Sequence, residues 1–171
     1  MGPSGVSVLD ALPEDEARAA LTRCCGASRW VEGMLARRPF GERVIEHARE
    51  VWAAMERSDV LEAFDHHPRI GASIERLRER FPASHELSAS EQSGVADAGE
   101  AILSRLRDGN VAYEARYGHI FIVCATGKTA AEMLALLEAR MGNAPEAELA
   151  IAAAEQMKIT EIRLTGLETA R

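Results

Sequence analysis

The sequence has few cysteines, few aromatic residues and no basic excess. Its 171 residues include three cysteines, and aromatic residues make up 5%. An odd cysteine count without a C-x-x-C pair fits neither a disulfide scaffold nor a thiolate zinc site. The formal net charge of −7 argues against a nucleic-acid partner, because phosphate contacts require a basic surface.

Targeting and membrane signals are also missing. No apolar run approaches the roughly 20 residues of a membrane-spanning helix. The opening stretch, MGPSGVSVLDALPEDEARAA, lacks the basic and apolar regions of a signal peptide. The chain ends in ETAR and not in the small–basic–Leu peroxisomal signal. These absences predict a cytoplasmic protein with no membrane partner.

The remaining composition is that of an ordinary globular protein. Hydrophobic residues make up 47% and charged residues 27% of the chain, as is usual for such proteins. Its length suits one domain with a buried core, and apolar residues recur at helical spacing along most of it. The sequence therefore predicts an all-α, single-domain, helical bundle-like fold over residues 1–171, with seven or more helices and with residues 1–6 flexible.

Charged and turn-forming residues mark helix boundaries in the amino-terminal half. Pro13 and the three acidic residues after it predict a helix start, and Gly26 predicts its end. Ser28 is expected to cap a second, short helix. Residues 41–58 carry one apolar face at helical spacing and predict a third helix. Asp59 is expected to cap the VLEAF segment that follows.

The carboxyl-terminal half leaves two local alternatives open. A helix is expected from residue 88 to about residue 106, and Asp-Gly-Asn at 108–110 either interrupts it or is absorbed in a longer helix. The apolar run HIFIVCA (119–125) is the only strand-like segment, and one strand makes no sheet, so we expect a buried extended segment or a buried helix. One or two further helical turns are expected at 74–80. Two more helices are predicted, one from the Thr129–Glu132 capping box onward and one that follows Pro145 and reaches about Leu167.

The segment FDHHPRIGAS (64–73) places two histidines directly before a proline. Pro68 restricts the backbone of His67, which we therefore expect at a helix end. An imidazole with a pKa near neutrality on a stiffened turn suits proton transfer. The local residues alone favour a simple turn histidine over a catalytic one.

Metal binding is another interpretation of the histidines. The residues that could in principle supply ligands are Asp65, His66, His67, His85 and His119. Adjacent histidines rarely both face one site, and no H-E-x-x-H spacing is present. No metal site is therefore predicted, and His47, His66 and His85 are interpreted as exposed histidines.

The ATGKT stretch (125–129) resembles part of a phosphate-binding loop. That loop requires a glycine five positions before the glycine of Gly-Lys, and this chain has Ile122 there. A helix cap accounts for residues 126–129. We therefore predict no nucleotide site.

SASEQ (88–92) and Arg163 each allow a structural and a functional interpretation. Ser88 and Glu91 form a capping box, which leaves Gln92 unexplained. A helix start also favours an anionic ligand, and an amide side chain can recognise the edge of a urea or amide. Arg163 lies at the border of an apolar helix face, where it either covers the edge of the core or holds a carboxylate or ureido oxygen in a pocket. Composition alone favours the first role for Arg163.

Taken in order, five segments resemble one family, the decarboxylases of 2-oxo-4-hydroxy-4-carboxy-5-ureidoimidazoline (OHCU) in urate degradation. The segments are RRPF (37–40), HHPRIGAS (66–73), SASEQSG (88–94), YEARYGHIFIVCA (113–125) and KITEIRL (158–164). Each segment is weak alone, but five at matching spacing across nearly the whole chain are specific. The chain departs from the resemblance at His119-Ile120, where many relatives have an aromatic residue and a proline.

The resemblance implies roles for individual residues. His67 would be the catalytic histidine, Glu91 would share its proton transfers, and Pro68 would contact the substrate. The other implied substrate-binding residues are Ser88, Ala89, Ser90, Glu91, Gln92, Phe121, Ile122, Val123, Cys124, Ala125 and Arg163. The segment 121–125 would contact the planar ring through its backbone, whereas His119 is expected to have no catalytic role.

The resemblance further implies an all-helical, cofactor-free homodimer that converts OHCU to (S)-allantoin and CO2. Neither a metal nor an organic cofactor is required, because a ring C=N beside the carboxylate-bearing carbon can accept the electrons that CO2 leaves behind. Two rival hypotheses stay open. They are a metal-dependent hydrolase of a cyclic ureide and a non-catalytic helical interaction module.

Overall fold

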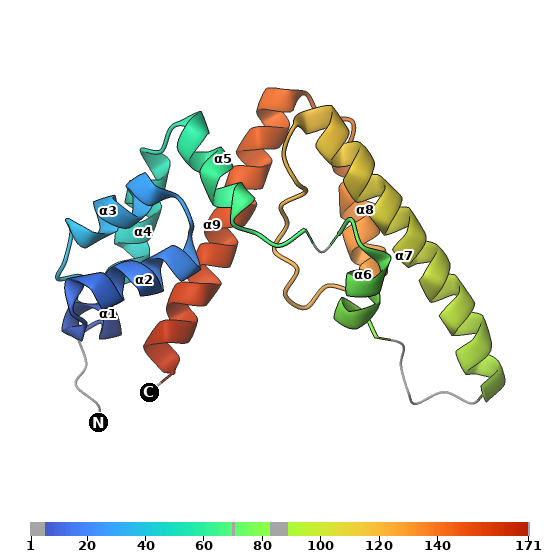
Figure 1. The fold of residues 1–171 in the computed structure, drawn as a ribbon, viewed down its shortest axis with the longest axis horizontal. Helices are drawn as coiled ribbons and strands as arrows, with labels where there is room; N and C mark the ends of the chain where they lie inside the picture. Colours follow the sequence, from blue (N-terminus) through green and yellow to red (C-terminus); the bar gives the residue numbers. More distant parts are fainter. Residues whose placement is uncertain (1–5, 70, 83–88, 171) are drawn as a thin grey trace. The chain divides into compact units, whose positions relative to one another are not determined.

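The computed structural model describes residues 6–69, 71–82 and 89–170, with their side chains except those of residues 89–98. Within these ranges the chain forms nine α-helices and no strand (Figure 1), which confirms the all-α prediction. The helices are α1 (Val8–Ala11), α2 (Glu14–Cys24), α3 (Ser28–Leu35), α4 (Val44–Ala53), α5 (Arg57–Asp65), α6 (Ile74–Arg80), α7 (Ala89–Tyr117), α8 (Ala130–Arg140) and α9 (Pro145–Thr169). None of the described helices is both long and apolar enough to cross a membrane.

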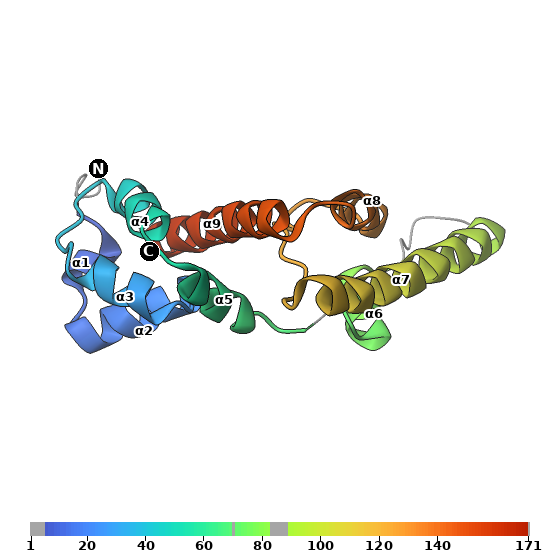
Figure 2. The same cartoon turned by 90° about the horizontal axis from the view of Figure 1, so that it is seen from above.

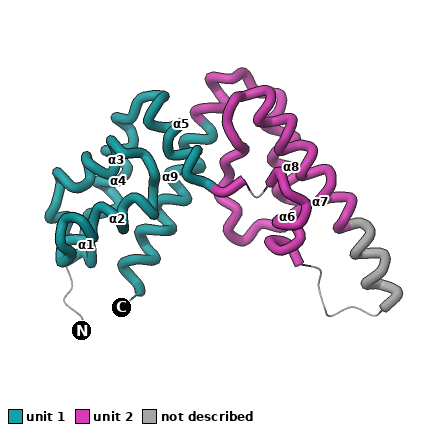
Figure 3. The backbone as a smooth tube through the Cα atoms, viewed as in Figure 1, with its two compact units in different colours: residues 1–67, 151–171 teal, residues 68–150 magenta. Residues whose placement is uncertain are grey.

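The chain divides into two compact units (Figure 3). Unit 1 comprises residues 1–67 and 151–171, and unit 2 comprises residues 68–150. The first boundary falls between His67 and Pro68. The second lies within α9, which begins in unit 2 and ends in unit 1.

Unit 1 buries one large apolar cluster, to which α1–α5 and the later turns of α9 contribute (Figures 1 and 2). Trp30 and Met34 lie four residues apart on α3 and are both fully buried, because residues at this spacing share one helix face. The indole Nε1 of Trp30 donates to the carbonyl of Ala48 on α4 at 3.2 Å. From α9, Met157 and Leu164 join the same cluster.

Two of the predicted helix caps in unit 1 are wrong in position. The N-cap of α3 is Ala27 and not Ser28, and the backbone N–H of Ser28 donates instead to the Glu62 carboxylate. The N-cap of α5 is Glu56, and Asp59 lies inside the first turn. There its carboxylate accepts from the Glu56 backbone N–H at 2.9 Å, which forms a capping box that the sequence pattern did not reveal.

Unit 2 contains α6, α7, α8 and the first turns of α9. Asp-Gly-Asn at 108–110 does not interrupt α7, which continues to Tyr117. A Cβ added to Gly109 would lie 2.7 Å from Leu137 Cδ2 on α8. Gly109 is thus the residue that lets α7 and α8 approach closely, so its helix-breaking tendency is outweighed by packing.

The HIFIVCA segment is not helical, so the buried-helix alternative is wrong. Ile122 and Cys124 are buried, whereas the residues that alternate with them, Phe121, Val123 and Ala125, are partly exposed. This alternation is the side-chain pattern of an extended chain. The extended-segment alternative is therefore confirmed.

Candidate active site

Unit 1 contains a pocket of about 310 Å³. Its lining residues are Thr22, Arg23, Gly26, Ala63, His66, His67, Gln156 and Arg163. They come from the end of α2, the end of α5 and one face of α9. Two residues singled out from the sequence, His67 and Arg163, thus line the same pocket.

The turn after α5 places His67 in this pocket. Helix α5 ends at Asp65 with His66 as its C-cap, and the backbone N–H of His67 donates to the Phe64 carbonyl at 3.1 Å. The prediction of a helix end at this position is confirmed. Pro68, which disfavours helical geometry in the residue before it, accounts for the stop.

A chain of polar side chains on α9 supports the His67 imidazole. His67 Nε2 lies 2.6 Å from Gln156 Oε1. Gln156 Nε2 donates to Thr160 Oγ1 at 3.2 Å, and Thr160 Oγ1 donates to the Gln156 backbone carbonyl at 3.0 Å. The side chains of Gln156 and Thr160 are almost completely buried, with 0% and 1% exposure, so water does not compete for these bonds.

The environment of His67 favours the neutral imidazole. Burial lowers the pKa of His67 below its ordinary value of 6.5, the hydrogen bond to Gln156 opposes that shift, and the positive charge of Arg163 adds to it. At neutral pH the ring therefore carries a lone pair and can accept a proton.

Arg163 both caps the end of α2 and lines the pocket. Its guanidinium Nη1 donates to the carbonyls of Arg23 at 3.4 Å and Cys24 at 3.3 Å. These carbonyls belong to the last turn of α2, where a cation is favoured. The same side chain lines the pocket, where it supplies positive charge close to His67.

His66 also lines the pocket, although the sequence suggested only an exposed histidine. The side chain is exposed, and its Nδ1 lies 3.0 Å from the Glu62 carbonyl. A Cβ on Gly26 would lie 2.1 Å from His66 Cγ. Gly26 is therefore required for this packing, in addition to following the end of α2.

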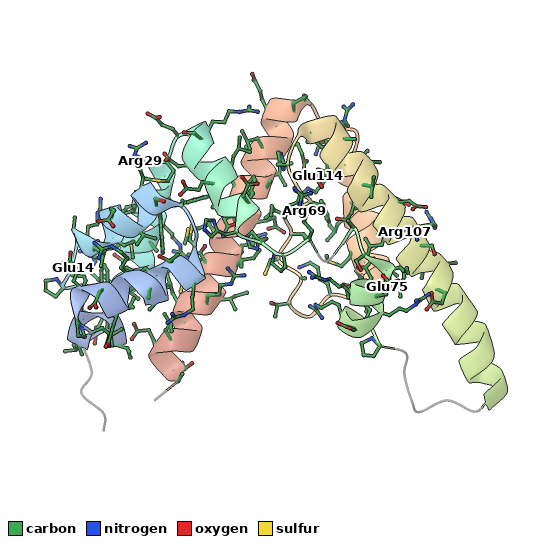
Figure 4. The ribbon with its side chains drawn as sticks, viewed as in Figure 1. Glu14, Arg29, Arg69, Glu75, Arg107 and Glu114 are labelled. Atoms are coloured by element: carbon green, nitrogen blue, oxygen red, sulfur yellow. The ribbon has the colours of Figure 1, made fainter. Side chains whose placement is uncertain are left out.

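Within unit 2, Pro68 and Phe121 line a small cavity of about 40 Å³. Arg69 follows Pro68 and forms an ion pair with Glu114 of α7 (Figure 4). This pair ties the start of unit 2 to α7. Two more of the residues implied by the resemblance are thus brought together, here inside unit 2.

The backbone of segment 121–125 is held by cationic side chains. Arg140 Nη1 donates to the Ile122 carbonyl at 2.7 Å, and Lys128 Nζ donates to the Cys124 carbonyl at 2.7 Å. These bonds satisfy carbonyls that a sheet would otherwise pair. They explain how one extended segment is stable among the described helices.

Arg140 is fixed in turn by a buried polar network. Its Nε donates to Glu148 Oε1 at 2.6 Å, and the Tyr113 hydroxyl donates to the same oxygen at 2.5 Å. Burial alone would raise the pKa of Glu148, but hydrogen bonds from Arg140, Tyr113 and Asn143 hold it below the ordinary value. Burial and the hydrogen bond to Glu148 raise the pKa of Tyr113, so the phenol remains a donor.

His119 packs against the aromatic side chains of this network. Its ring lies 5.6 Å from Tyr113 and 6.2 Å from Tyr117, centroid to centroid. His119 is buried, and its Nδ1 lies 3.0 Å from the Ile120 carbonyl. The ring therefore packs where the resemblance suggested an aromatic residue.

The remaining predicted site residues lie largely outside the described parts of the molecule. Ser88 falls outside the described residues, as does His85. Ala89, Ser90, Glu91 and Gln92 form the start of α7, and only their backbone is described. Among the described side chains, no three His, Cys, Asp or Glu residues are grouped so as to hold a metal ion.

Sequence reasoning missed Gln156 and Thr160. Both belong to the buried face of α9 together with Ala152 and Leu164. Polar residues at core-facing positions of an amphipathic helix are the signal that could have found them, because buried polar groups require partners. The partner of Gln156 is 89 residues away in sequence, so spacing could not identify it.

Comparison with known proteins places this geometry in one family. The family model of OHCU decarboxylase matches residues 10–165. The chain belongs to the OHCU decarboxylase family. The match confirms the resemblance drawn from the five sequence segments and covers residues of both units.

Two relatives and two solved structures resemble this OHCU decarboxylase family member. It is 41% identical over 148 residues to the uric acid degradation bifunctional protein TTL of Arabidopsis thaliana, covering 84% of this chain and 45% of the relative. It is 38% identical over 78 residues to the 2-oxo-4-hydroxy-4-carboxy-5-ureidoimidazoline decarboxylase of Amia calva, covering 44% of this chain and 43% of the relative. The chain thus spans less than half the length of the curated relatives it matches.

The fold is that of the structurally known members. A crystal structure of an OHCU decarboxylase in the presence of (S)-allantoin is 37% identical, with a TM-score of 0.70 over 92% of this chain and 99% of that one. An (S)-allantoin synthase structure is 20% identical and shares the fold, with a TM-score of 0.64 over 93% of this chain and 52% of that one.

Proposed function

We propose that the protein decarboxylates OHCU to (S)-allantoin and CO2 as a step of urate degradation. The observation that carries the proposal is the His67 pocket. There a neutral imidazole, held by a buried glutamine, lies beside the cationic Arg163. A proton acceptor next to a cation suits a reaction that loses a carboxylate and moves a proton. The names of the two relatives, one for this decarboxylation and one for uric acid degradation, support the assignment.

The substrate itself supplies the electron sink. When the bond between the ring carbon and the carboxylate breaks, CO2 leaves and the bonding pair moves toward the adjacent ring C=N. The enzyme then has to orient the carboxylate, stabilise developing charge and deliver a proton to one face of the ring. Partial burial of the carboxylate favours its loss as neutral CO2.

His67 and Glu91 share the proton transfers around the 4-hydroxyl and the new carbanion. Arg163 and Gln92 anchor ureido and ring carbonyl oxygens, since a guanidinium and an amide can both donate to them. Pro68, Ser88, Ala89, Ser90 and residues 121–125 make the other substrate contacts. The family resemblance supports these roles, together with a cofactor-free reaction, a homodimer and a cytoplasmic location.

The direct test supplies freshly made OHCU from urate, uricase and hydroxyisourate hydrolase. We expect the protein to accelerate OHCU decay and to yield one allantoin enantiomer, measured by absorbance and circular dichroism. Unchanged decay, or racemic allantoin, contradicts the proposal. Loss of activity with a chelator, restored by metal, would favour a metal-dependent hydrolase instead.

His67→Asn tests the role of the imidazole. We expect the rate of OHCU decarboxylation to fall roughly 10²–10⁴-fold, because general acid–base catalysis contributes about that much. The control is His47→Asn. His47 lies on α4, outside the lining of the pocket, so this variant should retain the wild-type rate. Equal rates for the two variants would exclude His67 from the chemistry.

A further inference from the structure

We propose that Gln156 and Thr160 are positioning residues that hold His67 with its proton on Nε2, so that Nδ1 is the nitrogen that exchanges a proton with the substrate. The position of the proton on Nε2 concerns the free protein. The role of Nδ1 toward the substrate rests on the proposed decarboxylase function.

The orientation of the Gln156 amide follows from the hydrogen bonds of Thr160. The Thr160 hydroxyl has one proton, which it donates to the Gln156 backbone carbonyl at 3.0 Å. Its other side-chain partner is Cys25, whose pKa is raised to about 11 by burial, so that the thiol stays protonated and does not compete as a thiolate for this proton. Toward the Gln156 side chain the hydroxyl can therefore only accept, and the amide Nε2 lies 3.2 Å away as the donor. The amide oxygen then faces His67, where Oε1 lies 2.6 Å from Nε2 of the ring.

The opposite amide orientation makes one hydrogen bond fewer. If the amide were flipped, its NH2 would face His67 and its oxygen would face Thr160. The single hydroxyl proton would then go to the amide oxygen, and the bond to the Gln156 carbonyl would be lost. Since both side chains are almost completely buried, no water replaces the missing bond, and the observed orientation is favoured.

An amide oxygen is an acceptor only, so His67 Nε2 must carry the proton that joins them. A neutral imidazole has one N–H, which leaves Nδ1 with its lone pair. Among the described side chains, none is hydrogen-bonded to Nδ1. The tautomer matters because burial and Arg163 keep this ring neutral at neutral pH.

The assignment defines a balanced proton path for the decarboxylation. Nδ1 takes the proton of the 4-hydroxyl as the carbon–carboxylate bond breaks and CO2 leaves. The bonding pair forms a double bond to the neighbouring ring carbon, and the displaced C=N pair goes to the ring nitrogen, which takes one proton from solvent. The resulting enolate re-forms its carbonyl while the neighbouring, ureido-bearing carbon receives the proton held on Nδ1, in the transfer that His67 shares with Glu91. Gln156 Oε1 accepts from Nε2 throughout and stabilises the intervening imidazolium.

The test reads the tautomer directly by NMR of 15N-histidine-labelled protein without substrate. We expect His67 of the wild type to show a protonated-type signal for Nε2 and an unprotonated-type signal for Nδ1. Thr160→Val keeps the shape of the side chain but removes the acceptor, so the amide can flip and the Nδ1–H tautomer should become populated. Thr160→Ser, which retains the hydroxyl, should restore the wild-type spectrum.

The kinetic readout should follow the spectra. We expect kcat for OHCU to fall roughly 5–10-fold in Thr160→Val with little change in KM, as one lost hydrogen bond implies, and to recover in Thr160→Ser. An Nδ1–H tautomer in the wild type, or an unchanged Nε2–H tautomer in Thr160→Val, overturns the inference.

A second variant, Gln156→Glu, is independent of the amide orientation. Its carboxylate can only accept, so His67 should become an imidazolium at neutral pH and the rate should rise at higher pH. A neutral His67 that carries its proton on Nδ1 in this variant also overturns the inference. The wild-type protein could show the Nε2–H tautomer and yet not accelerate OHCU decay. That result would overturn the proposed function and the role of Nδ1, while the tautomer assignment would stand.

Discussion

Unit 1 supports its candidate site with a neutral polar chain, whereas unit 2 supports segment 121–125 with an ionised one. In unit 1, His67, Gln156 and Thr160 are linked without a formal charge at neutral pH. In unit 2, Arg140 and Glu148 form a buried ion pair that fixes the Ile122 carbonyl. A neutral chain lets the imidazole gain and lose a proton, while a buried ion pair suits a backbone that only has to stay in place.

The apolar cores of the two units also differ in their residues. Unit 1 has a broad cluster that includes Trp30, Met34 and Phe40. The described core of unit 2 is built on five buried leucines, Leu77, Leu103, Leu106, Leu134 and Leu137. Because an unpaired buried charge is costly, we expect the stability of unit 2 to depend on the integrity of its polar network.

The largest effect is expected from Arg140→Met. The change leaves Glu148, which is 0% exposed, without its cation, and frees the Ile122 carbonyl. We expect the free energy of unfolding to fall by about 3–5 kcal/mol, measured by urea denaturation. The matched control is Arg105→Met, which removes an exposed ion pair between α7 and α8 and should cost no more than about 1 kcal/mol. Equal losses in both variants would refute the dependence of unit 2 on the buried pair.

A smaller effect is expected from Gly26→Ala in unit 1. The new Cβ would lie 2.1 Å from His66 Cγ, so the His66 side chain must move. Overpacking of this kind costs about 1–3 kcal/mol, measurable as a lower urea midpoint. The double variant Gly26→Ala, His66→Gly also removes the His66 Cβ, which would lie 2.6 Å from the new Cβ, and should regain most of the loss. If it does not, the backbone at Gly26 and not the His66 side chain is the constraint.

The smallest effect is a pH dependence that unit 1 contributes through His67. Because its folded-state pKa lies below the ordinary 6.5, the unfolded state binds the proton more readily. The stabilisation is therefore present above about pH 6.5 and is lost as pH falls through the folded-state pKa. Urea denaturation at about pH 7.5 and about pH 5.5 should show a larger acid loss for the wild type than for His67→Asn. An identical loss in both proteins would mean that His67 is not the titrating group.

The helices were predictable from sequence to the extent that their own residues determine them. The Thr129 cap of α8 is confirmed by its hydrogen bond from the Glu132 backbone N–H at 3.2 Å. The one or two turns expected at 74–80 coincide with α6, and α9, which was expected to follow Pro145, starts at that proline. These signals lie within a few residues of the feature they mark, so one sequence suffices.

Features that depend on distant partners were not predictable in this way. The helix expected over 41–58 is shorter, Val44–Ala53. Ser28 does not cap α3 with its side chain, and its backbone N–H donates instead to the carboxylate of Glu62, 34 residues away. Glycine is unfavourable inside an isolated helix, but the close packing of Gly109 against Leu137 of α8 keeps it within α7. For the candidate site, His67 and Arg163 came from the family resemblance. Their relation to Gln156 required the folded chain.

The distribution of the free thiols gives each unit its own chemical reporter. Cys24 and Cys25 lie buried in unit 1, and Cys124 lies buried in unit 2. Burial raises the pKa of Cys24 and Cys25 to about 11, so almost no thiolate exists at neutral pH and alkylation has to wait for local opening. Mass spectrometry of alkylated peptides would therefore time the opening of the two units separately within one unmodified chain.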